Sequence, residues 1–340
     1  MRGIVFRGEC NLELVTVPDP TPGPGEVVLE IKASGMCGSD LHFYRRSAAP
    51  ADTPVIAGHE PCGVVAALGP GATGPLARIG ARVMVHHYRG CACCEHCKSG
   101  WPQMCQSAPI AVYGTDAHGA HAPYMKVSVD TLVPLDERLS FAAGAAISCG
   151  TGTAWGAFER MGLTGRDDIA IFGQGPVGLS ATLLAKAQGA RVIALDIDDD
   201  RLNRAKAFGA DFIINPRSGD VVDKVRALTG GKGASMALET AGAAAAGQDA
   251  IGCVRPWGTI CLVGIGAEVR LSLANVLRKQ LRILTSWTMS IQGQRRCADF
   301  VLERGINLDA IFTDQWRLGQ AEEAYRTFNR QSGGKGVFLM

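Results

Sequence analysis

The sequence lacks several features that mark particular classes of protein. Its 34 basic side chains nearly balance its 32 acidic ones over 340 residues, for a net charge of +2. Such a chain has neither the strong basic field that nucleic-acid binding needs nor an acidic solvating tail. It also has no strongly apolar, uncharged run of about 18 residues, which a membrane-spanning helix requires. We therefore expect neither nucleic acid nor a membrane as a partner.

The first residues also lack a secretory signal. Residues 1–7 contain no apolar run long enough to serve as one, and Glu9 follows soon after. We therefore expect a cytoplasmic protein whose cysteines stay reduced, which favours thiolate metal ligands over disulfides.

Histidine is absent after residue 121, and cysteine is sparse after residue 149. All seven histidines and nine of the 12 cysteines lie in the part of the chain before residue 150. Imidazole and thiolate groups are common ligands of transition metals. A chain of this length usually forms about two domains. The asymmetry therefore predicts a two-part protein with metal chemistry in one part.

The two parts also differ in their secondary-structure patterns. The first contains short apolar runs separated by glycine and proline, which predict a β-barrel-like module. From about residue 165, apolar strands alternate with helices, which predicts a doubly wound parallel sheet. We expect residues 141–158 to form a buried helical segment. The apolar runs of the first part are residues 26–31, 62–68, 81–85 and 124–127, and the predicted strands of the second are residues 168–172, 191–196, 212–214, 235–239, 259–263 and 282–284.

A glycine-rich turn joins the first strand and helix of the predicted sheet. Its sequence is Gly173-Gln174-Gly175-Pro176-Val177-Gly178, a G-x-G-x-x-G pattern directly after an apolar strand. In that position the glycines permit a tight turn, close approach of a pyrophosphate and close helix–strand packing. Asp196 ends the next strand, where a carboxylate can bind the adenosine ribose hydroxyls, and Asp198, Asp199 and Asp200 would repel a 2′-phosphate. We therefore expect NAD rather than NADP; the alternative is a glycine turn beside a solvated acidic loop.

Four closely spaced cysteines form a second motif, C-x2-C-x2-C-x7-C. Thiolates at this spacing can enclose one zinc ion from a single loop. An iron–sulfur cluster is an alternative that the spacing alone leaves open. We interpret Cys93 as a bystander, and His96 can compete for a coordination position. The four proposed ligands are Cys91, Cys94, Cys97 and Cys105.

Cys37 and His59 lie on separate segments and do not by themselves demand a metal. Together with the other motifs, however, the chain resembles the zinc-containing medium-chain alcohol dehydrogenase family over essentially its full length. The matching stretches are residues 35–42, 58–60, 91–105, 148–153 and 173–178, followed by Asp196.

The resemblance implies an α/β fold with two domains. A GroES-like β-barrel catalytic domain would comprise residues 1–150 and 289–340. A Rossmann-type cofactor domain would comprise residues 151–288, with the reaction at the cleft between the two. The resemblance also implies a homodimer or homotetramer, formed by edge pairing of two cofactor-domain sheets.

The resemblance further implies a catalytic zinc ion, in addition to the zinc of the cysteine loop. Its ligands would be Cys37, His59 and Cys149, and the adjacent Glu60 can approach the metal. Polyol-type relatives often carry a glutamate in place of the last ligand, but no carboxylate adjoins Cys149. Asp40 would accept a hydrogen bond from His59 and fix its tautomer.

Other site residues follow from the same resemblance. Ser39 and His42 would relay a proton to solvent, the alternatives being a turn-capping serine and an ordinary exposed histidine. Thr153 would pack beside the nicotinamide, Arg201 would meet the adenosine ribose, and Lys335 would pair with the pyrophosphate. Candidates for the substrate wall, each equally consistent with core or rim positions, are His87, Tyr88, Tyr113, Trp155 and Trp287.

Taken together, the motifs predict an NAD-dependent zinc oxidoreductase that interconverts an alcohol and its aldehyde or ketone. A simple or secondary alcohol is the expected substrate. Alternatives within the family are a polyol dehydrogenase and a threonine-type dehydrogenase. A double-bond or quinone reductase on the same fold is a further enzymatic alternative, and a non-enzymatic binding protein is the remaining one.

Overall fold

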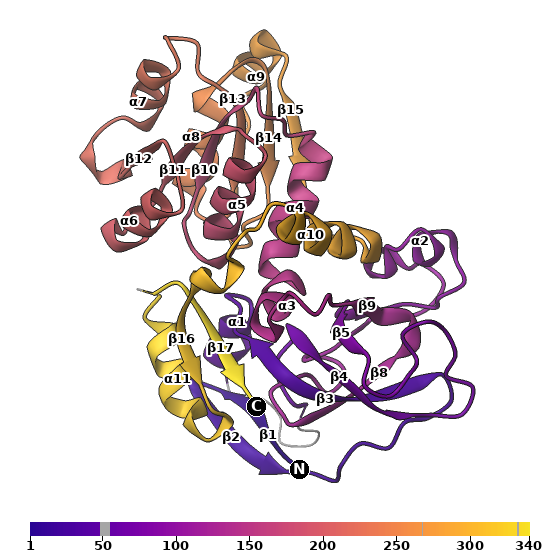
Figure 1. Ribbon diagram of the computed structural model, residues 1–340. Coiled ribbons are helices and arrows are strands. Elements are labelled where there is room, and N and C mark those ends of the chain that lie inside the picture. The colour runs from indigo at the N-terminus through magenta and orange to yellow at the C-terminus, as the bar shows by residue number, and fades with distance from the viewer. Residues whose placement is uncertain (48–54, 267, 332) are drawn as a thin grey trace. The chain divides into compact units, whose positions relative to one another are not determined.

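The computed structural model describes residues 1–47, 55–266, 268–331 and 333–340. Its contacts divide the chain into two units (Figure 1). Unit 1 combines Met1–Gly152 with Ser290–Gln331 and Lys335–Met340, and unit 2 consists chiefly of Thr153–Met289. No helix among the described residues is both long enough and apolar enough to cross a membrane.

Unit 1 is built around a seven-stranded sheet with the order β16-β17-β3-β4-β5-β9, in which β8 also pairs with β3. The long strand β3 (Glu26–Gly35) pairs along its length with β4 (Pro61–Leu68). Its other edge is shared by β8 (Tyr124–Ser128) and β17 (Lys335–Leu339). A strand near the C-terminus is thereby fixed against the segment that leads to Cys37. The other elements of unit 1 are β1 (Arg2–Gly8), β2 (Asn11–Thr16), α1 (Asp40–Arg45), β5 (Arg82–Val85), β6 (Tyr88–Arg89), α2 (Glu95–Lys98), β7 (Ala111–Val112), β9 (Leu132–Pro134), α3 (Phe141–Ile147), α10 (Ile291–Glu303), β16 (Phe312–Trp316) and α11 (Ala321–Asn329).

The apolar runs of the first part form the core of unit 1. Alternate residues of β3, including Val27, Leu29 and Ile31, face one buried cluster, as the two-residue period of a strand dictates. A second buried cluster joins β1 and α1 to the C-terminal helix α11. Aromatic side chains dominate it, among them Phe6 and Tyr325, whose ring centroids lie 4.8 Å apart.

The segment predicted to be buried and helical over residues 141–158 is largely buried and helical, but it forms two helices with a short break between them. Helix α3 ends at Ile147 and α4 (Gly150–Met161) begins after a break at Ser148 and Cys149. The Ser148 hydroxyl contacts the carbonyl oxygens of both Gly144 and Pro61, at 3.0 and 2.9 Å, which links the end of α3 to β4. The break takes Cys149 out of a regular helix.

Unit 2 contains the predicted parallel sheet, with the strand order β12-β11-β10-β13-β14-β15. All neighbouring pairs are parallel, and β13 is buried at every position, as expected for a sheet covered on both faces. The predicted fold class is therefore confirmed. The strands are β10 (Asp168–Phe172), β11 (Arg191–Leu195), β12 (Phe212–Ile214), β13 (Ala234–Glu239), β14 (Val254–Leu262) and β15 (Arg282–Thr285).

The helices of unit 2 connect successive strands (Figure 1). Helix α5 packs on β10 and β11, whereas α8 packs on β13 and β14. Such crossover connections are right-handed. A helix whose connection moves toward one edge of the sheet therefore covers the opposite face from a helix whose connection moves toward the other edge. The strand order reverses between β10 and β13, the position at which open α/β sheets bind ligands. The helices are α5 (Pro176–Ala187), α6 (Asp199–Ala207), α7 (Val221–Leu228), α8 (Ala244–Cys253) and α9 (Leu273–Lys279).

Candidate active site

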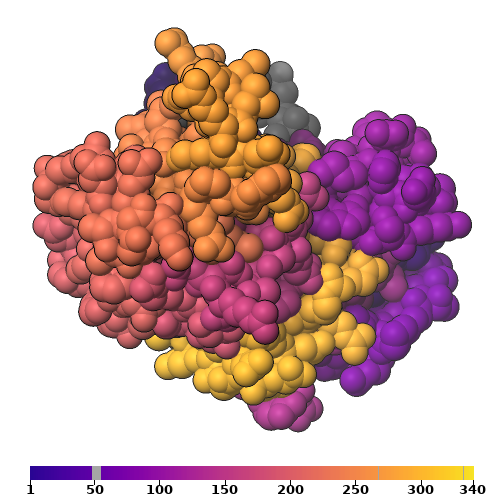
Figure 2. Space-filling model, turned by 90° about the horizontal axis from the view of Figure 1, so that it is seen from above, coloured from indigo at the N-terminus to yellow at the C-terminus, as the bar shows by residue number. Residues whose placement is uncertain are grey.

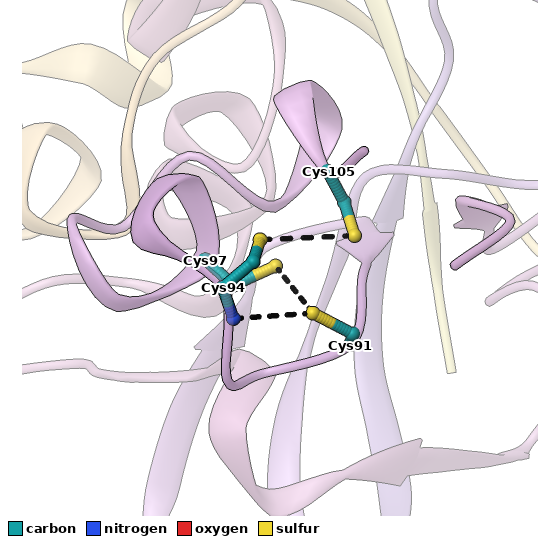
Figure 3. A group of neighbouring side chains, drawn as sticks. All are labelled: Cys91, Cys94, Cys97 and Cys105. Carbon is teal, nitrogen blue, oxygen red and sulfur yellow. Dashed lines mark hydrogen bonds between the residues drawn. The ribbon is translucent and has the colours of Figure 1, made fainter. Parts of the chain in front are cut away.

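The four cysteines of the C-x2-C-x2-C-x7-C motif converge in unit 1 (Figure 3). The Sγ atoms of Cys91 and Cys97 lie 3.9 Å apart, as do those of Cys94 and Cys105. Four sulfur atoms placed tetrahedrally at about 2.3 Å from one zinc ion are about 3.8 Å apart. The donor set therefore fits a single zinc ion. A [4Fe–4S] cluster, in which each cysteine binds a different iron, would require wider spacing of the sulfur atoms.

The backbone of this loop favours thiolates. The amide groups of Cys93 and Cys94 point at the Cys91 sulfur and lower the pKa of that thiol to about 5. The Cys93 side chain is exposed and lies outside the four-sulfur group, although its own sulfur is 3.5 Å from that of Cys91. The loop is also bound to α10, because the Ile291 amide donates to the Gly100 carbonyl at 2.8 Å.

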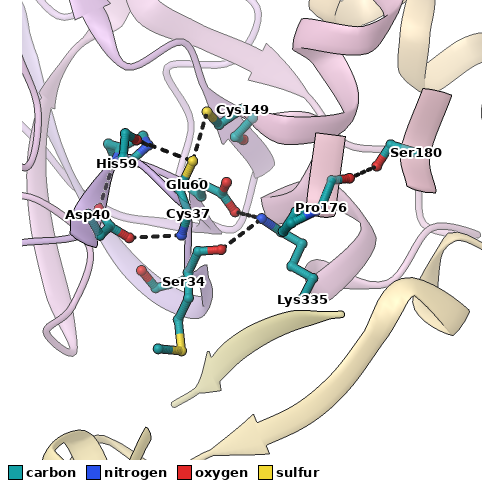
Figure 4. Close-up of polar contacts among 12 residues, drawn as sticks. Ser34, Cys37, Asp40, His59, Glu60, Cys149, Pro176, Ser180 and Lys335 are labelled. Atoms are coloured by element: carbon teal, nitrogen blue, oxygen red, sulfur yellow. Dashed lines mark hydrogen bonds and ion pairs between the residues drawn. The ribbon is translucent and has the colours of Figure 1, made fainter. Parts of the chain in front are cut away.

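A second group of metal-ligand side chains lies elsewhere in unit 1 (Figure 4). Cys37 follows the end of β3, His59 and Glu60 immediately precede β4, and Cys149 occupies the break between α3 and α4. One ligand atom from each of these four residues lies within 4.8 Å of the others. The structure thus brings together the three residues predicted to bind the catalytic zinc, with Glu60 beside them.

Asp40, on the first turn of α1, organises two of these residues. Its Oδ2 accepts a hydrogen bond from the Cys37 amide at 2.8 Å, and its Oδ1 lies 2.9 Å from Nδ1 of His59. Because the carboxylate only accepts, Nδ1 carries the proton. Nε2 of His59 is therefore the nitrogen that can bind a metal, as the resemblance implies.

Glu60 is completely buried and pairs with Lys335. The Lys335 ammonium lies 2.5 Å from Oε2 of Glu60 and donates to the Met36 carbonyl at 3.0 Å. Oε1 of Glu60 is a buried carboxylate oxygen with no hydrogen-bond partner among the described residues. A buried carboxyl oxygen without a hydrogen-bond partner, beside two cysteines and a histidine, fits a divalent cation such as zinc.

The charges of this group are strongly coupled. A hydrogen bond with Cys149 and the neighbouring His59 outweigh burial and hold the pKa of Cys37 well below its ordinary value. Burial lowers the pKa of His59, but Asp40 and Cys37 outweigh this effect and raise it well above the usual range. The same hydrogen bond with Cys37, together with burial, raises the pKa of Cys149 well above its ordinary value. Without a metal, the negative charge of the two thiols is therefore concentrated on Cys37, next to a protonated His59.

The two predicted relay residues lie next to this group. The Ser39 hydroxyl is 3.2 Å from both Cys37 Sγ and His59 Nε2. Its side chain makes no capping hydrogen bond at the start of α1, so the turn-capping alternative finds no support. His42 is exposed on the same helix, where it can exchange protons with solvent.

The candidates for the substrate wall have different environments. The His87 ring is buried 5.2 Å from that of His59, and its Nδ1 donates to the Ser148 carbonyl at 3.0 Å. Tyr88 packs against His87. Tyr113 belongs to the apolar core, where its hydroxyl accepts from the Ser128 amide at 2.9 Å. Two further candidates, the half-buried Trp155 and the exposed Trp287, belong to unit 2.

The glycine turn of unit 2 has the geometry that the pattern predicts. Gly173 has a φ of +86°, which disfavours any side chain. A Cβ atom on Gly178 would lie 1.7 Å from the Gly173 carbonyl oxygen, whereas one on Gly175 would meet no atom within 4 Å. Gly178 is therefore required for packing, and the space at Gly175 is open. Gly175 is the N-cap of the 12-residue helix α5, which begins with Pro176 and Val177 and whose N-terminal dipole favours phosphate.

Asp196 lies beside this turn and is largely buried. Its Oδ2 accepts from the Gln174 amide at 2.6 Å and its Oδ1 from the Asp198 amide at 3.0 Å. Arg201 lies 3.8 Å from the same carboxylate. The acid predicted to bind ribose and the arginine predicted to accompany it are thus adjacent at one end of the sheet.

The remaining cofactor residues are placed separately. Thr153 is buried near the start of α4, in unit 2. Lys335 belongs to unit 1 and is engaged with Glu60, so its assignment to the pyrophosphate stays a prediction. Tyr325 and His121, which contact Asp40 directly and indirectly, were not singled out from the sequence. The only sequence signal was a histidine between two alanines in an apolar stretch.

Comparisons with known proteins agree over nearly the whole chain. A family model described as alcohol dehydrogenase GroES-like domain matches residues 23–137, and one described as zinc-binding dehydrogenase matches residues 176–303. An uncharacterised zinc-type alcohol dehydrogenase-like protein of Escherichia coli is 35% identical over 99% of this chain and 98% of its own length. Sorbitol dehydrogenase of Bacillus subtilis is 32% identical over 95% and 92%. A crystal structure of an NAD-dependent alcohol dehydrogenase is 32% identical, with a TM-score of 0.88 over the full length of both chains.

Proposed function

Because this chain belongs to the zinc-containing medium-chain alcohol dehydrogenase family, we propose that it transfers a hydride between an alcohol and NAD. The observation that carries the proposal is the group of Cys37, His59 and Cys149, whose ligand atoms lie within 4.8 Å of one another, with His59 held by Asp40. Three protein ligands of this type leave a coordination position for substrate. The cysteine loop supplies a separate structural zinc site.

When bound, zinc lowers the pKa of an alcohol hydroxyl as a Lewis acid, and NAD accepts the hydride. The protein residues orient the metal ligands and move the proton. Asp40 holds His59 in the tautomer that presents Nε2. The Ser39 hydroxyl is within hydrogen-bond distance of two of the metal ligands, so it can accept the proton of an alcohol bound there. His42, exposed on the next turn, can pass that proton to solvent.

The cofactor preference is supported by the surroundings of Asp196. Two backbone amides fix its carboxylate, and Asp198, Asp199 and Asp200 follow directly. A ribose diol can donate to such a carboxylate, whereas a 2′-phosphate is repelled by it. NAD is therefore the proposed cofactor.

For the substrate we propose a simple or secondary alcohol. The support is Cys149, which supplies a thiolate where a polyol-type site would carry a carboxylate. The alternative is a polyol, because one of the relatives is a sorbitol dehydrogenase, or a β-hydroxy amino acid such as threonine. His87 bears on this choice, since its Nδ1 donates to Ser148 and leaves Nε2 as an acceptor for a second substrate hydroxyl.

A substrate panel with the zinc-loaded protein tests the proposal. Primary alcohols, secondary alcohols, polyols and threonine are each supplied with NAD or NADP, and NADH formation is followed by absorbance. We expect two zinc ions per chain, measured by mass spectrometry, and turnover of secondary alcohols with NAD. One zinc per chain together with quinone reduction would favour the reductase alternative. Failure of NAD to raise the melting temperature would favour a non-enzymatic binding protein.

We further propose that the chain forms a homodimer or homotetramer through unit 2. Strand β15 lies at the edge of the sheet, and the segment that contains the neighbouring α9 is coloured orange in Figure 2. Helix α9 exposes Leu273 and Leu277, at 67% and 68%, one helical turn apart. Exposed apolar pairs beside an open sheet edge support association with a second copy. Light scattering of the double variant Leu273→Asp/Leu277→Asp should show a smaller assembly than the wild type, and an unchanged mass would refute this assignment.

A further inference from the structure

A chain of buried hydrogen bonds continues from the metal-ligand group into the interior of unit 1. The Tyr325 hydroxyl lies 3.2 Å from Oδ2 of Asp40, on the carboxylate that also binds His59. Nε2 of His121 lies 2.6 Å from the same hydroxyl, and Ser34 Oγ lies 2.7 Å from Nδ1 of His121. The chain therefore runs Ser34–His121–Tyr325–Asp40–His59.

The direction of every proton in this chain follows from the carboxylate at its end. Asp40 only accepts, so Tyr325 donates its single hydroxyl proton to it. The Tyr325 oxygen must then accept from Nε2–H of His121. Nδ1 of His121 in turn has no proton and accepts from the Ser34 hydroxyl. All the donors point toward Asp40, so a single tautomer of each histidine satisfies the network.

Each member of the chain comes from a different part of unit 1. Ser34 lies on β3, His121 precedes β8, Tyr325 lies on α11 and Asp40 begins α1. The side chains of Ser34, His121 and Tyr325 are completely buried. Burial lowers the pKa of His121 to about 4, which keeps the ring neutral as the proton assignment requires. Such a fully satisfied network in a low-dielectric interior is rigid.

We propose that Tyr325 and His121 are positioning residues for the catalytic metal site. They fix the Asp40 carboxylate, which in turn sets the orientation and tautomer of His59. Without the Tyr325 proton, Oδ2 keeps only the Cys37 amide, and the carboxylate can rotate away from Nδ1 of His59. This proposal rests on the proposed function only in that the site binds a metal ion; it does not depend on the substrate.

The variant Tyr325→Phe removes the hydroxyl and keeps the ring that packs against Phe6 and Phe338. The readout is zinc affinity, measured by competition with a chromogenic chelator, with the zinc of the cysteine loop as an internal reference. We expect catalytic-site affinity to fall roughly three- to tenfold, less than the 10–100-fold typical of groups that contact a ligand directly. The matched control is Tyr44→Phe, from the same aromatic cluster, which should leave both affinities unchanged.

A pair of variants at His121 tests the donor-to-acceptor direction of these hydrogen bonds. His121→Phe removes the donor to Tyr325 and should weaken zinc binding as Tyr325→Phe does. His121→Gln supplies an amide N–H donor and should restore most of the affinity. Because the two residues belong to one hydrogen-bond network, the double variant Tyr325→Phe/His121→Phe should lose no more zinc affinity than the single variant with the larger loss.

A spectroscopic measurement separates positioning from stability. With cobalt in the catalytic site, the visible d–d bands should shift in Tyr325→Phe and remain as in the wild type in Tyr44→Phe. If Tyr325→Phe lowers the melting temperature but leaves zinc affinity and cobalt bands unchanged, its role is structural and the proposal is overturned. Unchanged affinity in His121→Phe would also overturn it. If the wild type binds two zinc ions but oxidises no alcohol, the proposed function fails while this test still applies.

Discussion

The ammonium group of Lys335 lies 2.5 Å from Oε2 of Glu60, and both side chains are almost completely shielded from water. Burial raises the pKa of Glu60, and Lys335 opposes that rise. Lys335 belongs to β17 and Glu60 immediately precedes β4, so the pair joins two strands that flank β3. The charge of Glu60, next to the metal ligands, is therefore balanced by Lys335 from the C-terminal part of the chain.

Lys335→Met should destabilise the protein strongly, because it leaves a buried carboxylate without its partner. The expected loss is about 3–5 kcal/mol of unfolding free energy, the usual result of breaking a buried ion pair. The double variant Glu60→Gln/Lys335→Met removes both charges and should recover much of the loss. Urea denaturation of the zinc-free proteins measures both values; a single variant as stable as wild type would show that the pair contributes little.

Two glycine-to-alanine variants of the nucleotide turn should behave differently. Gly178→Ala places a methyl group 1.7 Å from the Gly173 carbonyl oxygen and should cost at least about 2 kcal/mol of stability. Gly175→Ala meets no protein atom within 4 Å, so the fold should tolerate it. It should instead weaken NAD binding by occupying the space for the pyrophosphate. Melting temperatures and NAD titrations measure the contrast, and equal effects on stability would contradict it.

Cys37→Ala should abolish alcohol oxidation while NAD binding to unit 2 persists. The substitution removes one of three proposed zinc ligands and leaves the glycine turn and Asp196 intact. Steady-state kinetics and NAD titration by tryptophan fluorescence supply the two measurements. The control is Cys10→Ala, an exposed cysteine of the same unit, which should retain activity. Turnover by Cys37→Ala near the wild-type rate would refute the assigned site.

Cys94→Ala should impair folding rather than chemistry alone. Four thiolates around one zinc ion contribute directly to folding stability, so the loss of one should weaken the whole loop. Cys93→Ala is the matched control, because its side chain is exposed and lies outside the four-sulfur group. Zinc content, soluble yield and melting temperature should fall only in Cys94→Ala; equal losses in both variants would make Cys93 a ligand.

The free energy of unfolding should decrease as the pH falls, because His121 becomes protonated. Burial lowers the pKa of this histidine from 6.5 to about 4; Asp40 opposes that shift and His59 reinforces it. Between pH 6.5 and 4 the unfolded chain therefore binds a proton that the native state does not, and the free energy of unfolding decreases on acidification. The pKa shift of His121 contributes ~3 kcal/mol to the free energy of unfolding. This contribution is fully present above pH 6.5 and is lost as the pH falls toward 4. Urea denaturation at pH 7, 6 and 5 should show a shallower pH dependence for His121→Phe, and parallel profiles would contradict the assignment.

The sequence predicted the features whose residues lie close together along the chain. The glycine turn and the cysteine loop have fixed local spacing, and the alternation of strands and helices gave the parallel sheet. Contacts between distant segments carried no such signal. Tyr325 and Asp40 are in contact although 285 positions separate them in the sequence, and neither residue type predicts a contact with the other. The break at Ser148 had no local signal either, and the Ser148 hydroxyl bonds there to Pro61 of β4, a residue distant along the chain.

The interruption of unit 1 by unit 2 has a consequence for the order of folding. Tyr325 and Lys335 are synthesised after the whole of residues 153–289, whereas Cys37, His59 and Cys149 precede that segment. The start and end of the segment lie side by side, since a Cβ atom on Gly156 would be 2.4 Å from the Thr288 carbonyl oxygen. Once unit 2 has folded, it therefore draws the two halves of unit 1 together and reduces the entropy cost of joining them. On the ribosome we expect unit 2 to fold first and to hold the two halves of unit 1 close together. The group of metal-ligand residues can then be completed only when Tyr325 and Lys335, which contact Asp40 and Glu60, have been synthesised.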